Sequence, residues 1–294
     1  DPLEKYGGHT GNQAFTVGQD GKIYLGLRRG IIRITPGTFK VEEIAMPEGL
    51  LQGKTGVILG VANERSIAWA CATACAGAGA RLIFNYLGEP LEKRVKRLLS
   101  EHLPDAPAYP CDVSKDEDIT DFFRNVRNHT ERLDFVVHSL AYADREDLQR
   151  DFVGTSRASF ALAMDISAYS LVAVAREAAP LMTAGGSIVT MTYFGSEKVV
   201  PNYNVMGVAK AALEASARYL ASDLGPQGIR VNCVSAGPVR TLSASAIAGA
   251  RAIGRYVEKV SPLRRNVDVA EVGHAALYLV SDWSSAITGE VLHV

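Results

Sequence analysis

From residue 49 onward, the hydrophobic and polar positions of the chain alternate between two patterns. Short, almost continuously apolar runs are followed by longer segments in which apolar residues recur at helical spacing. The first pattern is typical of strands buried on both faces, and the second of amphipathic helices. Strands are expected at 54–60, 80–86, 108–111, 133–138, 186–192, 228–234 and 290–294. Helices are expected at 66–77, 89–102, 115–130, 157–182 and 205–224, with two more before the last strand.

This alternation predicts an α/β fold over residues 49–294. Apolar strands separated by helices form a parallel sheet covered on both faces, and right-handed crossovers make it a doubly wound, Rossmann-type sheet. Ligands of such sheets bind at the carboxyl ends of the strands. The residues that follow each expected strand are therefore the candidates for a functional site in this single domain.

Residues 1–48 follow a different pattern. Short β segments are expected at 21–27, 30–35 and 39–44, separated by turn residues. The run D-G-K-I-Y-L-G followed by G-I-I-R-I-T-P resembles one blade of a β-propeller, and a single blade cannot bury both of its faces. We expect a short β-rich N-terminal extension, to which the sequence assigns no function.

Composition narrows the classes of function. With 47% hydrophobic and 21% charged residues, the 294-residue chain is globular and not disordered. A net charge of −1 gives no overall basic field for nucleic acid or an anionic membrane. The apolar run 67–80 is too short to span a bilayer. The four cysteines and six histidines show no metal-site or disulfide spacing, so we expect no metal and a reducing compartment, the cytoplasm.

The first strand leads into a candidate phosphate-binding turn. It ends at Gly60, and a tight turn brings the chain to Ser66, a good N-cap for the next helix. Free N–H groups at a helix start favour an anion, although the usual G-x-G-x-x-G is absent. Asp112, after the third strand, can accept a hydrogen bond from an adenine amino group, cap the following helix, or do both. His138, at the end of the fourth strand, is expected to be a core histidine.

The end of the second strand bears on cofactor choice. It reads N-Y-L-G (85–88), without the acidic residue that grips a ribose 2′-hydroxyl or the arginine that accepts a 2′-phosphate. The missing positive charge favours NADH over NADPH, although Lys93 or Arg94 of the following helix could still reach a 2′-phosphate.

A tyrosine and a lysine follow the fifth strand. Tyr203 and Lys210 are separated by six residues, about two helical turns. If Tyr203 lies at the helix entrance, both groups face one cleft, and the ammonium favours the phenolate and eases proton transfer. A core tyrosine with a surface lysine is the alternative. The position directly after a strand end favours a catalytic pair.

With these residues the sequence resembles the short-chain dehydrogenase/reductase superfamily. Most of that superfamily carries Tyr-x3-Lys, but position 207 is glycine here. Tyr-x6-Lys, with a second tyrosine ten residues upstream at Tyr193, is similar to the bacterial NADH-dependent enoyl-[acyl-carrier-protein] reductases of type II fatty-acid synthesis. Further motifs of that family are G-x5-S-I-A (60–68), P-N-Y-N-V-M-G (201–207), S-A-G-P-V-R-T (235–241) and G-E-V-L-H-V (289–294).

The resemblance implies a reaction and residue roles. Hydride passes from NADH to C3 of a trans-2-enoyl thioester carried on acyl carrier protein, and Tyr203 donates a hydrogen bond to the thioester oxygen. Tyr203, Lys210 and Tyr193 are the implied catalytic residues, and Ala143, Tyr193 and Tyr203 the implied substrate-binding residues. The implied cofactor-binding residues are Gly60, Ser66, Ile67, Leu87, Asp112, Val113, Leu140, Lys210, Val239, Arg240, Thr241, Leu242 and Ser243. Residues 242–257 would form a lid over the acyl chain, and the assembly would be a homotetramer.

Two other functions stay open at this point. The chain could reduce a carbonyl, such as that of a 3-oxoacyl thioester, as other members of the superfamily do. It could also be a non-catalytic dinucleotide-binding protein. A basic cluster at 251–265 is either a docking patch for the acidic carrier protein or a solvated helix face.

Overall fold

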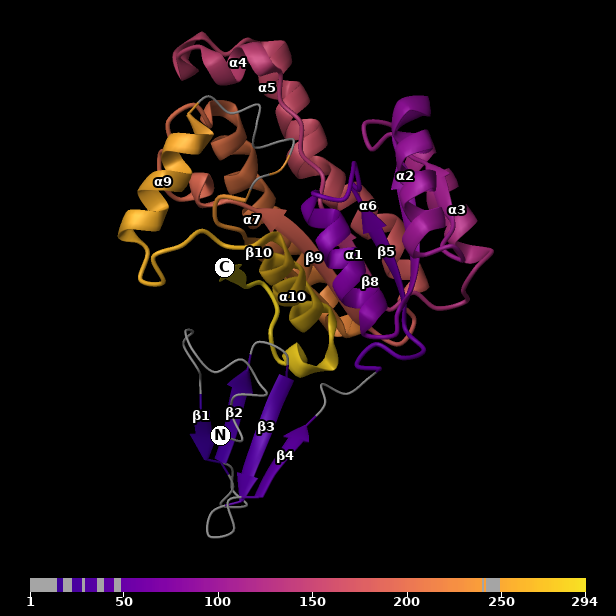
Figure 1. Cartoon of the computed structure of the whole chain (residues 1–294). Helices are drawn as coiled ribbons and strands as arrows, with labels where there is room; N and C mark the ends of the chain where they lie inside the picture. The colour runs from indigo at the N-terminus through magenta and orange to yellow at the C-terminus, as the bar shows by residue number, and fades with distance from the viewer. Residues whose placement is uncertain are drawn as a thin grey trace.

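The computed structural model describes residues 49–239, 241 and 249–294, together with four short strands within residues 1–48. The strands expected after residue 49 form one sheet with the order β11-β10-β9-β8-β5-β6-β7, and all neighbours run parallel. Figure 1 labels β10, β9, β8 and β5 among them. Its strands are β5 (Thr55–Leu59), β6 (Arg81–Tyr86), β7 (Ala108–Pro110), β8 (Phe135–His138), β9 (Gly186–Thr192), β10 (Ile229–Ser235) and β11 (Val291–His293). The doubly wound parallel sheet predicted from the sequence is confirmed.

Helices cover both faces of this sheet. The core on one face includes α1 (Ile67–Gly77), α2 (Gly88–His102) and α10 (Val269–Val280). The core on the other includes α3 (Asp116–Arg127), α6 (Ser170–Ala178) and α7 (Asn204–Leu224). Strand β8 shows why the sheet reads as continuous apolar runs: Phe135 and Val137 pack into the first core and Val136 into the second.

The helical segment expected at 157–182 is divided. It comprises α5 (Arg157–Met164), one π-helical turn (Asp165–Tyr169), α6 and a 3-10 turn (Ala179–Leu181). Residues 157–181 are long and apolar enough to cross a membrane, and 44% of the most apolar window is buried. Its α6 portion packs in the core with α3 and α7, as expected for a core helix of a soluble domain.

Shorter elements surround the carboxyl ends of the strands. They are α4 (Arg145–Gln149), a 3-10 turn (Phe152–Gly154), a second such turn η5 (Phe194–Ser196) and α9 (Ala250–Val260). The sequence pattern did not predict α4. Of the predicted lid, residues 242–248 lie outside the described residues, and the rest falls within α9 and the residue before it.

The N-terminal extension contains its own antiparallel sheet. Strands β1 (Phe15–Val17), β2 (Ile23–Leu27), β3 (Gly30–Thr35) and β4 (Lys40–Ile44) pair in chain order (Figure 1). The three expected β segments are confirmed, and β1 was missed. A three-residue strand is too short to show alternation of hydrophobic and polar positions.

Candidate active site

The order of the strands reverses at β5, which lies between β6 and β8. Gly60, which follows β5, has a φ of +98°, and a Cβ there would lie 2.1 Å from the carbonyl oxygen of Ser139, which follows β8. Only glycine fits this crossing of two strand ends. The turn therefore leads from the switch point of the sheet, where doubly wound folds bind dinucleotides, into α1.

A buried amide that sequence reasoning missed supports this crossing. Asn85, on β6, accepts a hydrogen bond from the Gly60 N–H at 2.9 Å and donates one to the Cys111 carbonyl at 3.4 Å. It thereby links the carboxyl ends of β5, β6 and β7. The one sequence signal is a polar residue inside the otherwise apolar run L-I-F-N-Y.

Ser66 caps α1 as predicted. Its hydroxyl accepts a hydrogen bond from the Trp69 N–H at 3.3 Å and donates one to the Asn63 carbonyl at 2.7 Å. The neighbouring Ile67 is half-buried and begins the helix. The first turn of α1 thus presents backbone N–H groups at the switch point.

Asp112 does not cap α3, contrary to one of its expected roles. Lys115 occupies the N-cap position, and the Asp112 carboxylate instead accepts hydrogen bonds from the Ser114 N–H at 3.1 Å and hydroxyl at 2.7 Å. The chain leaves β7 through this Asx turn, and Asp112 lies three residues before the N-cap position of α3. Partial burial raises the pKa of Asp112, but the Ser114 hydrogen bonds and the Lys115 charge outweigh it, so the pKa is lowered. A carboxylate that can accept a further hydrogen bond follows β7.

The other predicted cofactor-binding residues lie at the same edge. Val113 is buried, Leu140 and Val239 pack partly buried against the two cores, and Leu87 is 53% exposed before α2. The Thr241 N–H donates to the Val239 carbonyl at 3.0 Å. The predicted residues Arg240, Leu242 and Ser243 lie outside the described residues.

Tyr203 stands at the entrance of α7. Its ring lies edge-on against the ring of Tyr193, with 4.9 Å between the centroids. Both tyrosines belong to a small apolar cluster that also contains Ala143 and Met206. The structure therefore brings the three predicted substrate-binding residues together, with Tyr203 only 8% exposed.

Two glycines fix the close approach of α7 to the preceding turn. A Cβ on Gly195 would lie 2.4 Å from the Tyr203 ring, and a Cβ on Gly207 would lie 2.7 Å from the Gly195 carbonyl oxygen. Position 207 is where a Tyr-x3-Lys arrangement would place its lysine. A lysine there is sterically excluded by this backbone, which accounts for the longer spacing to Lys210.

Lys210, two helical turns after Tyr203, is buried as well. It is 5% exposed, and its Nζ donates to the Met191 carbonyl at 2.7 Å. Burial lowers the pKa of Lys210 to about 8, although nearby Cys233 and Glu214 oppose the shift. Lys210 thus lies at the end of β9 and not on the surface of α7.

The expectation that Lys210 would favour the Tyr203 phenolate is wrong. Burial, with smaller effects from Tyr193 and Glu214, raises the pKa of Tyr203. The Lys210 ammonium is directed to the Met191 carbonyl, and it does not offset the loss of hydration around the phenol. Tyr203 is therefore held as a neutral hydrogen-bond donor.

Glu214 is a second residue that sequence reasoning missed. It lies one helical turn after Lys210, is 6% exposed, and accepts a hydrogen bond from the Thr192 hydroxyl at 2.6 Å. Its position four residues after a candidate lysine could have suggested a pair.

His138 is a core residue, as expected. It is fully buried, with Nδ1 3.0 Å from the Thr190 hydroxyl and Nε2 2.9 Å from the Ser170 hydroxyl. Burial, followed by the charge of Lys210, lowers the pKa of His138 to about 3. The neutral ring joins β8, β9 and α6.

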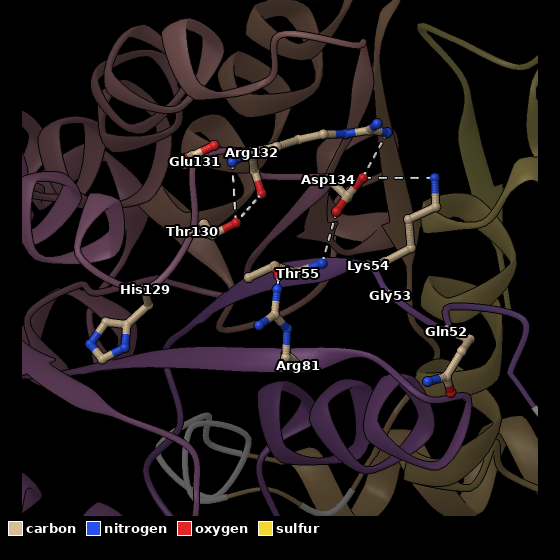
Figure 2. A pocket seen from close by; sticks show the side chains of 10 residues that line it. All are labelled: Gln52, Gly53, Lys54, Thr55, Arg81, His129, Thr130, Glu131, Arg132 and Asp134. Carbon is tan, nitrogen blue, oxygen red and sulfur yellow. Dashed lines mark hydrogen bonds and ion pairs between the residues drawn. The ribbon is translucent and has the colours of Figure 1, made fainter.

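A pocket of about 450 Å³ lies at the opposite edge of the sheet, at the amino ends of β5, β6 and β8 (Figure 2). Its buried carboxylate, Asp134, accepts from the Thr55 N–H at 2.8 Å and pairs with Arg132 at 2.9 Å and Lys54 at 3.7 Å. Figure 2 shows these partners converging on Asp134. The group joins strands and lies far from Tyr203. In the described residues, no three histidine, cysteine or acidic side chains could hold a metal ion.

Comparisons with known proteins agree with this geometry. A family model described as enoyl-(acyl carrier protein) reductase matches residues 60–294. The enoyl-[acyl-carrier-protein] reductase [NADH] of Bacillus cereus is 52% identical over 83% of this chain and 96% of its own length. A reductase [NADH] 1 of Rhizobium meliloti is 53% identical over 85% of this chain and 92% of its own length.

Solved structures of enoyl-acyl carrier protein reductases are also similar to this chain. The crystal structure of the Bacillus cereus enoyl-acyl carrier protein reductase with NADP+ and indole naphthyridinone has a TM-score of 0.82 at 52% identity, covering 84% of this chain and 96% of that one. The NADH reductase of Aquifex aeolicus has a TM-score of 0.80 at 48% identity, covering 83% and 96%. The chain therefore belongs to the enoyl-(acyl carrier protein) reductase family of the short-chain dehydrogenase/reductase superfamily.

Proposed function

We propose that this protein reduces the trans-2 double bond of enoyl thioesters carried on acyl carrier protein, with NADH, in fatty-acid elongation. The observation that carries the proposal is the buried pair of Tyr203 and Lys210 at the carboxyl edge of the sheet, beside the switch point at Gly60. The names of the relatives, enoyl-[acyl-carrier-protein] reductases, support the same reaction.

The residues at the switch point fit a dinucleotide. The tight crossing at Gly60 leaves no side chain between the turn and a pyrophosphate, and the first turn of α1 offers N–H donors. Asp112 offers an acceptor for an adenine amino group. Lys210 would hold the nicotinamide ribose hydroxyls. NADH, when bound there, supplies the hydride for C3 of the enoyl thioester, and C2 then takes up a proton from water to complete the reduction.

Tyr203 performs the electrostatic part of the reaction. Reduction at C3 drives negative charge onto the thioester oxygen, and a donor aimed at that oxygen lowers the barrier because the charge exists only near the transition state. Its raised pKa keeps the phenol protonated and able to donate at neutral pH. Tyr193 and Ala143 line the apolar cluster that receives the acyl chain and excludes water from the reacting carbon.

NADH is the proposed cofactor. Position 87 carries a leucine and not a basic residue, and the nearby Lys93 is paired with Glu89 at 2.6 Å. A ribose 2′-phosphate would therefore meet an apolar side chain at position 87, and Lys93 would have to leave Glu89 to reach it. Related reductases of Staphylococcus aureus are named as NADPH enzymes, so the family includes both choices.

The partner we propose is acyl carrier protein, docking on the basic side of α9. Arg255 and Lys259 are exposed there, whereas Arg265 makes a bidentate pair with Glu271 at 2.6 Å. The basic surface available to such a partner therefore contains fewer free cations than the sequence cluster at 251–265 suggested.

A homotetramer in the cytoplasm is the proposed assembly. Exposed apolar side chains on α5, the π turn and α7 (Phe160, Tyr169 and Val208) would be covered in it.

The test is NADH oxidation with two thioesters, crotonyl and acetoacetyl. Turnover of the crotonyl thioester is expected, and Tyr203→Phe should lower its kcat by about 10²- to 10³-fold because one oxyanion donor is lost. Tyr219→Phe, an exposed tyrosine on the same helix, is the control and should leave kcat unchanged. Turnover of the ketone alone would make this a carbonyl reductase. No turnover of either, with NADH bound, would make it a binding protein.

A further inference from the structure

Two consecutive residues at the end of β9 hold the two buried charges of α7. The Met191 carbonyl accepts from the Lys210 ammonium at 2.7 Å, and the Thr192 hydroxyl donates to the Glu214 carboxylate at 2.6 Å. Lys210 and Glu214 are four residues apart, so they share one face of the helix. The two residues are 5% and 6% exposed, so both charges are largely shielded from water.

A buried ammonium without a counter-charge is costly and loses its proton easily. The groups that face Lys210 from the packed elements are His138 of β8, Cys233 of β10 and Glu214 of α7. His138 is neutral because burial lowers its pKa to about 3, and Cys233 is neutral because burial raises its pKa to about 12. On α4, Asp147 is paired with Arg150 at 3.4 Å. Among the described groups, Glu214 supplies the negative charge to Lys210.

We propose that Glu214 is a positioning residue whose buried carboxylate keeps Lys210 protonated for the ribose of NADH, an inference that rests on the proposed function. The same carboxylate disfavours a phenolate at Tyr203. The Glu214 carboxylate thus favours the protonated form of both groups, and for the phenol it adds to the larger effect of burial. Thr192 fixes the carboxylate, and Met191 fixes the amine.

The experiment measures the dissociation constant of NADH by fluorescence from pH 6 to pH 9.5, on the full chain without substrate. Glu214→Gln keeps the shape of the side chain and an acceptor for the Thr192 hydroxyl, and removes only the charge. Asp223→Asn removes an exposed carboxylate from the same helix and is the matched control. Thr192→Val loosens the carboxylate without neutralising it, and serves if the glutamine variant does not fold.

For Glu214→Gln, we expect the alkaline loss of NADH affinity to move to lower pH by on the order of one unit, with about fivefold weaker binding near pH 8 and about tenfold at pH 9.5. Thr192→Val should shift in the same direction by less, and Asp223→Asn should match the parent protein. A lower melting temperature with an unmoved pH profile would overturn the inference and leave the proposed function intact. If Lys210→Met also left NADH affinity and its pH profile unchanged, the proposed role of Lys210 itself would fall.

Discussion

At the scale of single residues, the Tyr203 ring packs directly against the backbone of Gly195. A Cβ on Gly195 would lie 2.4 Å and 2.8 Å from two atoms of the Tyr203 ring. We predict that Gly195→Ala displaces the phenol from its place beside Tyr193. The variant should lose at least about tenfold in kcat and about 1–3 kcal/mol of stability, as overpacked sites do. Steady-state kinetics and urea unfolding measure the two effects.

The matched control is Gly225→Ala, just beyond the end of α7. A Cβ there meets nothing within 4 Å, so its stability should be unchanged or higher by up to about 1 kcal/mol, with normal kcat. Equal kcat for the parent protein and Gly195→Ala would mean that Tyr203 is not held by this contact.

The side chain at position 87 should set the choice between NADH and NADPH. The Leu87 side chain is 53% exposed directly after β6, where a 2′-phosphate of NADPH would meet it. Leu87→Arg should raise kcat/KM for NADPH by about tenfold or more, because a guanidinium pairs with phosphate through two parallel hydrogen bonds. Leu87→Gln, polar but uncharged, is the control. A gain of equal size in the glutamine variant would show that polarity, not charge, sets the preference.

The site residues that could be predicted are those with a local role. Ser66 follows from its place before a helix, and the Tyr203–Lys210 spacing follows from the helical period. The partners of Asn85 and Glu214 could not be predicted, because Gly60 and Thr192 are 25 and 22 residues away along the chain. Only the packed sheet brings those groups together.

At the scale of elements, the buried His138 at the end of β8 should make the stability of the fold depend on pH. In the unfolded chain a histidine has a pKa near 6.5, whereas burial lowers the pKa of His138 to about 3. Between these values the unfolded state binds a proton that the native state does not, so stability falls as the pH falls. This one group should cost about 2 kcal/mol between pH 7.5 and pH 5.

Urea unfolding at the two pH values measures that cost. His138→Gln should be less stable at pH 7.5, because it loses ring packing, yet should show a smaller further loss at pH 5. His274→Gln, at an exposed position of α10, should retain the parent pH dependence. If His138→Gln keeps the full loss at pH 5, other groups cause the acid sensitivity.

Element boundaries were predictable where one pattern dominates. Strand β9 has the bounds that its apolar run predicts, because both faces are buried along its length. The π turn at Asp165–Tyr169 could not be predicted, since a helix with one inserted residue keeps nearly the same apolar periodicity. Helix α4 has five residues, too few to establish a period.

At the scale of the whole molecule, the sequence separates residues 1–48 from the rest, and we predict that residues 49–294 fold and act alone. Strands β1 to β4 pair with one another in a sheet of their own, and strands β5 to β11 form the other sheet. The relatives point the same way, since the Bacillus cereus protein aligns over 96% of its length with 83% of this chain. A chain beginning at Gly49 should match the full chain in kcat/KM and melting temperature.

The starting residue matters, and it supplies the control. Leu51 is 1% exposed, packs in the core that contains α1, and its N–H donates to the Ala78 carbonyl at 2.8 Å. A chain beginning at Lys54 lacks this anchor and should lose about 2–5 kcal/mol, the cost of removing a buried leucine. Thermal unfolding and NADH oxidation with crotonyl thioester compare the three chains. An inactive chain from Gly49 beside an active full chain would give the extension a role in catalysis or assembly, because the remainder of the sheet is the same in both.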